Sequence, residues 1–150
     1  MHRILPIFIL SVFGISFAPL LWALPSIAYR QMTTSATVGA TMHLEPNDMP
    51  HAGRASKTWF MLTQRGGSLI PSANCRCQMV VYDAGNRALS VGTTAVHQFP
   101  LSPVSVDHHQ AIGTTVTFPK AGTYTVVLSG QAQDKSFDPF ELIFPVVVNP

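Results

Sequence analysis

The sequence predicts an all-β sandwich of about seven short antiparallel strands in a single domain. Three observations lead to this fold class. Apolar residues recur with a period of two in several segments after residue 30, where no window has a convincing helical period. Turn-forming clusters of Gly, Pro, Asn and Asp separate these segments. The length of 150 residues suits one domain, and the composition, 47% apolar and 11% charged, excludes a disordered chain.

The first thirty residues have the pattern of a secretory signal peptide. Residues 1–3 (MHR) give a positive start, residues 4–24 are almost all apolar, and residues 26–28 (SIA) have the small-x-small form of a cleavage site. The sequence therefore predicts a signal peptide over 1–28 and export to the periplasm or the cell exterior. The alternative is an uncleaved leader, because a stretch as long as 4–24 can cross a bilayer as an anchor. A membrane contact is expected in that case alone.

Six segments after the leader are predicted as strands of the sandwich domain, 37–150, with 29–36 as a flexible N-terminus. Residues 58–63 are apolar on both faces and are expected in the centre of a sheet. Pro145 interrupts the last segment, and because proline has no N–H for a central ladder, that strand is expected at an edge or with a bulge. Residues 88–111, broken by prolines, are expected to carry one weak strand in an irregular excursion. The predicted strands are 37–44, 58–63, 78–82, 115–118, 123–129 and 140–148.

The sharpest local motif is FPKAGTYTVVL at residues 118–128. A turn ending at Gly122, then Tyr124, then alternating aliphatic residues resemble the corner before strand F of immunoglobulin-like sandwiches. The pattern as a whole is similar to small bacterial periplasmic sandwiches of the copper-resistance and YtkA-like types. The resemblance implies an immunoglobulin-like fold with the Tyr124 hydroxyl bonded to nearby backbone. Trp59, inside an apolar run, is expected to be a structural core residue.

Cys75-Arg76-Cys77 is the most unusual local feature, and the sequence leaves two interpretations of it open. In a regular strand, residues two apart share a face with their Cα atoms about 6.6 Å apart, which places the Cβ atoms too far apart for a bridge. If the chain turns here, an oxidising compartment favours a disulfide between the two cysteines. If the strand has already begun, two thiols on one face could hold a soft metal such as Cu(I) or Zn.

Histidines and a methionine extend the set of candidate metal ligands. The turn after residue 42 combines imidazole, thioether and carboxylate groups, a mixture of donors that suits copper. If consecutive strands run up and down, this turn lies at one end of the sandwich. The cysteines then lie at the other end, together with the histidine pair His108 and His109. The two groups are therefore not expected to form one site. The candidate ligands are His43, Met49, His51, Cys75, Cys77, His108 and His109.

Charge and motif content exclude several functional classes. The formal charge is +2, from nine basic and seven acidic residues without a basic run, so nucleic acid is not expected as a partner. No Gly-x-Ser-x-Gly elbow, phosphate-binding glycine loop or helical two-histidine zinc motif is present, so no enzyme activity is expected. The sequence predicts an exported, non-enzymatic binding module of the cell envelope whose partner is an envelope protein or a small ligand. The alternative is periplasmic copper binding or handling.

Overall fold

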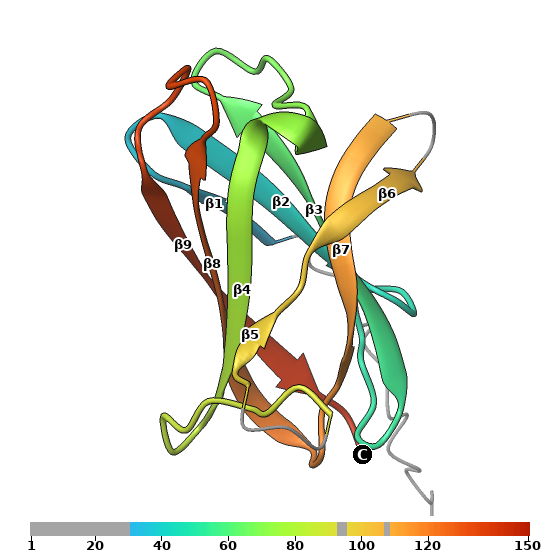
Figure 1. Cartoon of the computed structure of the whole chain (residues 1–150). Helices are drawn as coiled ribbons and strands as arrows, with labels where there is room; N and C mark the ends of the chain where they lie inside the picture. Colours follow the sequence, from blue (N-terminus) through green and yellow to red (C-terminus); the bar gives the residue numbers. More distant parts are fainter. Residues whose placement is uncertain (1–30, 93–95, 107–108) are drawn as a thin grey trace, which may run out of the picture.

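The structure, a computed structural model, describes residues 31–92, 96–106 and 109–150 and forms a two-layer antiparallel sandwich (Figure 1). The predicted all-β fold is confirmed. Over the described ranges the helical content is one short 3-10 turn, η1 (Ser72–Asn74), and no helix is long and apolar enough to cross a bilayer. The predictions for the leader and for His108 fall outside the described residues.

One layer is a five-stranded sheet with the order β1-β2-β3-β7-β6. The segment predicted from alternation becomes β2, in which every second side chain is buried. The neighbouring β3 is the central strand, as predicted for residues 58–63. The strands are β1 (Gln31–Thr34), β2 (Val38–Leu44), β3 (Ala55–Gln64), β6 (Ser102–Val106) and β7 (His109–Thr117).

The second layer is a four-stranded sheet with the order β5-β4-β8-β9. Its last strand alternates strictly between buried and exposed side chains and lies at the edge of the sheet, as predicted for the strand that contains Pro145. The strands are β4 (Cys75–Asp83), β5 (Gln98–Phe99), β8 (Gly122–Ala132) and β9 (Phe140–Val148).

Two segments differ from the prediction. Residues 31–34, expected to be flexible, form β1, because the following Ser35 turns the chain back and its N–H donates to the Val38 carbonyl at 2.7 Å. The excursion between residues 88 and 111 carries two short strands, β5 and β6, and the start of β7, instead of one weak strand. Pro103 is tolerated within β6 because this strand lies at the edge of its sheet.

The core lies between the two sheets and is built from aromatic and aliphatic side chains of both. Phe60 on β3 and Phe144 on β9 are fully buried, with ring centroids 5.6 Å apart across the two layers. At the corner before β8, Tyr124 is buried against Phe118 at 5.0 Å between ring centroids. Its hydroxyl donates to the Lys120 carbonyl at 2.9 Å. This is the bond that the sequence predicts for an immunoglobulin-like corner.

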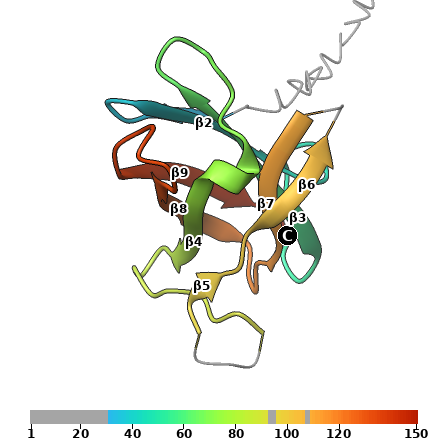
Figure 2. The ribbon, with the colours of Figure 1, turned by 45° about the horizontal axis from the view of Figure 1, so that its top comes forward.

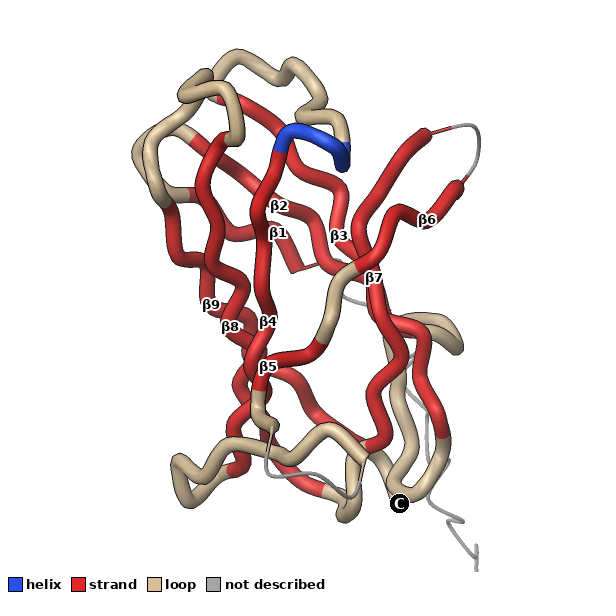
Figure 3. Tube along the Cα trace, in the orientation of Figure 1, coloured by secondary structure: helices blue, strands red, loops and turns tan. Residues whose placement is uncertain are grey.

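The strand directions gather the connections at two ends of the sandwich (Figure 3). The turn between β1 and β2, the loop 65–71, η1 and the loop 133–139 lie at one end, which we call the η1 end. The loop 45–54 and the C-terminus lie at the opposite end, where His51 forms an isolated bridge with Asn149.

Candidate functional site

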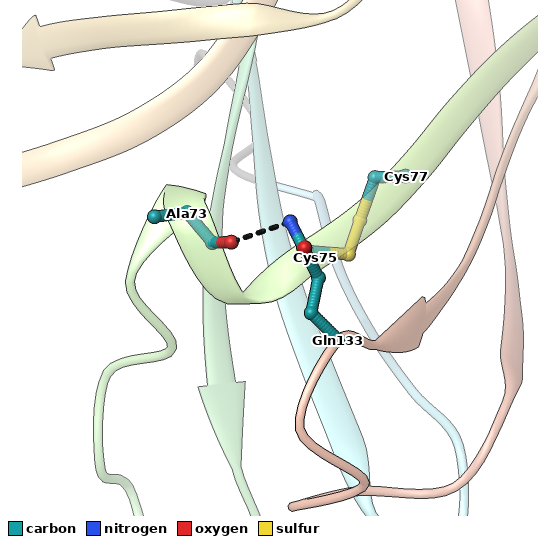
Figure 4. Close-up of a disulfide and its surroundings, with 4 residues drawn as sticks. All are labelled: Ala73, Cys75, Cys77 and Gln133. Carbon is teal, nitrogen blue, oxygen red and sulfur yellow. Dashed lines mark hydrogen bonds between the residues drawn. A yellow bond between two sulfur atoms is a disulfide. The ribbon is translucent and has the colours of Figure 1, made fainter.

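A disulfide joins Cys75 and Cys77 at the η1 end, where η1 runs into β4 (Figure 4). Their Cα atoms are 5.3 Å apart, closer than the roughly 6.6 Å of a regular strand, so the backbone is compressed at this entrance to β4. Both sulfurs are bonded to each other, and no free cysteine is present in the described part of the chain. In this state neither cysteine offers a thiolate to a metal.

Gly130 on β8 makes room for this disulfide. It lies opposite Cys77 in the sheet, and a Cβ atom at Gly130 would come within 2.7 Å of the Cys77 Sγ and 2.9 Å of the Cys75 Sγ. The neighbouring loop is tied to η1, because Gln133 Nε2 donates to the Ala73 carbonyl at 2.7 Å (Figure 4). Gly130 is not among the residues predicted from the sequence; the available signal was a glycine inside an alternating strand.

A groove lies at the same end of the sandwich, between the β1–β2 turn and the turn that follows β3. Its cavity has a volume of about 480 Å³ and is lined by residues 34–39 and 63–66, which we call the loop-end groove. A second hollow of about 250 Å³ shares Thr37, Gln64 and Arg65 with it and reaches the loop 133–139. Figure 2, in which the η1 end comes forward, shows the three connections clustered there.

The residues that line the groove are mostly small or polar, and one of them, Arg65, is charged. The backbone N–H of Arg65 donates to the Thr37 carbonyl at 2.9 Å and fixes one turn against the other. The Arg65 side chain is exposed and has no ion-pair partner among the described residues. Gly66 has a φ of +101°, so the tight turn requires glycine at this position. Arginine side chains are common recognition groups for carboxylates and phosphates.

Sequence reasoning missed this groove because its residues come from two turns that are distant in the sequence. Arg65-Gly66-Gly67-Ser68 is recognisable as a turn, and the arginine in front of the two glycines was the available signal. Only the pairing of β2 with β3 brings that turn beside residues 34–39.

His43 and Trp59 form a stacked pair on the outer face of the five-stranded sheet. They are opposite each other on β2 and β3, with ring centroids 4.1 Å apart and an interplanar angle of 21°. Trp59 was expected in the core; it is half-buried on the outer face because Phe60 takes the inward position of β3. His43 Nδ1 lies 3.4 Å from Asp48 Oδ1, which also accepts the Leu44 N–H at 2.8 Å. These contacts hold the His43 ring over the indole of Trp59.

The remaining candidate ligands are dispersed. His51 Nδ1 lies 2.9 Å from the Pro150 carbonyl at the end opposite to η1, and Met49 is half-buried in the same loop. His109 begins β7 at the η1 end and is exposed. Over the described ranges, no three His, Cys, Asp or Glu side chains are grouped around a common point that could hold a metal ion.

Two aspartates in turns have lowered pKa values. The pKa of Asp83 is lowered first by the backbone N–H of Arg87, which donates to its Oδ1 at 3.0 Å, and further by the Arg87 guanidinium. Hydrogen bonds from the Ser136 side chain and backbone lower the pKa of Asp134. Both carboxylates therefore hold turns in place in their charged form.

The likeness of this chain to known proteins is a likeness of fold. No known protein family and no curated protein sequence matches it. A DUF4426 family protein from Pseudomonas aeruginosa PAO1 superposes with a TM-score of 0.57 at 8% identity, covering 81% of this chain and 95% of that one. FetP of the uropathogenic E. coli strain F11, expressed recombinantly in the periplasm of E. coli, superposes with a TM-score of 0.57 at 11% identity, covering 80% and 93%. These likenesses show a shared β-sandwich architecture.

Proposed function

We propose that the protein is an exported, non-enzymatic binding module that takes a small anionic ligand into the loop-end groove. The observation that carries this proposal is the cavity of about 480 Å³ whose lining includes Arg65, an exposed arginine. Cavities of about 300–1,000 Å³ are usual for small-molecule sites. A ligand carboxylate or phosphate would accept a bidentate pair of hydrogen bonds from Arg65 and further bonds from neighbouring hydroxyl groups such as that of Thr34.

Export is part of the proposal. The leader pattern of residues 1–28 and the bridge between the two cysteines both favour an oxidising compartment outside the cytoplasm. The mature chain is then expected to begin at Tyr29, which N-terminal sequencing of the protein from its own cells would read directly. An intact Met1 on protein recovered from membranes would contradict cleavage and support the anchored alternative.

Copper handling is the second function that the sequence raises, and the geometry gives it less support. His43, Met49 and His51 lie toward the end of the sandwich opposite to η1, whereas the cysteines lie at the η1 end with both sulfurs already bonded. An envelope protein as partner would need a wider contact than the groove supplies, since specific protein interfaces bury about 800 Å² on each side.

Backbone amide shifts of ¹⁵N-labelled mature protein, titrated with small carboxylates, sugar acids and phosphates, test the proposal. Binding should perturb amides of residues 34–39 and 63–66, and Arg65→Gln should weaken it at least about tenfold through loss of a charge-assisted pair. Arg54→Gln is the matched control, because Arg54 is an exposed arginine in the loop at the opposite end. Equal binding by Arg65→Gln, or shifts confined to other surfaces, would contradict the groove as the site. Shifts around His43 and His51 on adding copper would favour the second function.

A further inference from the structure

The outer face of the four-stranded sheet carries an unusual row of aliphatic side chains. Val80 on β4, Val127 on β8 and Ile143 on β9 are consecutive partners across three strands and point away from the core. Ile143 is 52% exposed and Val147, further along β9, is 68% exposed. An outward sheet position in contact with water usually carries a polar residue. A continuous apolar row on this face is therefore typical of a surface that another molecule covers.

The next row extends the apolar area, and polar residues border it. Tyr82 and Pro145 lie on either side of Thr125 in the register. On the side toward the η1 end, Gln78, Ser129 and Glu141 form a polar row. An apolar centre with a polar border is the usual anatomy of a protein interface. We call the area formed by Val80, Tyr82, Val127, Ile143, Pro145 and Val147 the outer patch.

Two charged side chains flank the outer patch at its η1 end. Arg76 lies on β4 and Glu141 on β9, with β8 between them. Both are exposed, and neither takes part in an ion pair within the described part of the chain. The face therefore carries a positive side chain on β4 and a negative one on β9, with Glu141 in the row of Gln78 and Arg76 one row further toward the η1 end.

We propose that a second copy of this chain covers the outer patch, related by a two-fold axis that runs along β8. Such an axis lays β4 of one protomer over β9 of the other at equal height. It sets the row of Val80, Val127 and Ile143 against itself in reverse order. It also brings Arg76 to within one row of Glu141 of the partner subunit, twice, an offset that two long side chains can bridge. Sandwich sheets commonly pack face to face with nearly aligned strands, as this arrangement requires. A two-fold axis perpendicular to the strands would lay β4 over β4 with ends reversed and would pair no charges.

The geometry of the β9 edge favours packing through the face over the addition of a strand. Pro145 has no N–H to donate to a new neighbour in the middle of β9. The Ile143 carbonyl already accepts the Thr33 hydroxyl of β1 at 3.1 Å. Continuation of the sheet along β9 is thus hindered, whereas the Ile143 and Val147 side chains of the outer patch are exposed.

Sedimentation equilibrium of the mature protein, from about 1 µM to about 1 mM, tests the proposal. The wild type should be a reversible dimer. Ile143→Lys and Val127→Lys should each raise the dimer Kd at least about 100-fold, because the two-fold axis places each new charge in the interface twice. Met32→Lys is the matched control: Met32 is 72% exposed on the other sheet, and its replacement should leave the Kd unchanged. Circular dichroism and thermal unfolding should show that every variant keeps the fold.

Charge exchange tests the direction of the axis. Arg76→Glu should weaken the dimer, and Arg76→Glu combined with Glu141→Arg should restore it. A wild type that is monomeric over the whole range would overturn the proposal, as would a dimer that survives both lysine substitutions in the outer patch. Failure of the exchanged pair to restore the dimer would overturn the axis along β8. Arg65→Gln should leave the Kd unchanged, so this inference and the loop-end groove succeed or fail separately.

Discussion

Two hydroxyl groups in the core have no hydrogen-bond partner among the described residues, and one of them gives a sharp test of the packing. Thr58 on β3 is 0% exposed, and its Oγ1, like the Ser56 Oγ, is buried without a partner. Leaving a buried hydroxyl unsatisfied costs about 1–3 kcal/mol, whereas an apolar group of similar shape carries no such cost. Thr58→Val replaces the hydroxyl by a methyl group at nearly constant volume and keeps the β-branched shape that suits a strand.

The variant should therefore increase the free energy of unfolding by about 1 kcal/mol, at the lower end of that range because the new methyl group must fit the same space. For a domain of this size the gain corresponds to a rise in Tm of about 3–5 °C. Urea unfolding followed by Trp59 fluorescence and calorimetry measure the two quantities. Trp59 is a suitable reporter because its indole is half-buried under His43 in the folded state.

Thr115→Val is the matched control, because Thr115 is exposed on β7 and its hydroxyl can bond to water. It should change the stability by less than about 0.5 kcal/mol. A destabilised or unchanged Thr58→Val protein, with Thr115→Val unaffected, would refute the reasoning. That result would mean that the Thr58 hydroxyl contributes a hydrogen bond worth as much as its burial costs.

Three further predictions concern the corner, the disulfide and a surface turn. Tyr124→Phe should lower the unfolding free energy by about 1 kcal/mol in urea titrations, because water can reach the freed Lys120 carbonyl at its exposed turn. Gly130→Ala should cost about 1–3 kcal/mol while the disulfide is intact and less after reduction, since its Cβ would contact both sulfurs; an equal cost in both states would refute this contact. Asp83→Asn should lower the Tm near neutral pH. The lowered pKa of Asp83 means that the carboxylate stabilises the fold above about pH 4 and loses this effect as the pH falls through the lowered pKa, so the two proteins should converge in acid; a constant difference would contradict it.

The sequence predicted those parts of the fold that depend on local periodicity. Alternation along β2, β8 and β9 identified these strands, and Pro145 identified the sheet edge, because both signals act within a single strand. Trp59 was misplaced because its run is apolar at consecutive positions, so the period of two could not say which side faces the core. The packing of Phe60 against Phe144 of the other sheet decided it.

The candidate sites depended on contacts between distant parts of the chain, and local patterns could not supply them. The loop-end groove forms where β1, whose residues were expected to be flexible, turns back beside Arg65. The two interpretations of the cysteines depended on the distance between their Cα atoms, which is 5.3 Å in the structure and about 6.6 Å in a regular strand. No residue pattern encodes so small a compression at the entrance to β4. Gly130 belongs to the same problem, because its importance lies in the sulfurs across the sheet.

Native mass spectrometry of the protein isolated from its own cells tests most directly whether the loop-end groove binds a ligand. The protein should carry a stoichiometric small organic or phosphorylated anion that is released on mild activation. The same preparation of Arg65→Gln should lack this mass, whereas Arg54→Gln should keep it. Stoichiometric copper on both variants, with no organic ligand, would contradict the account and assign the protein to metal handling.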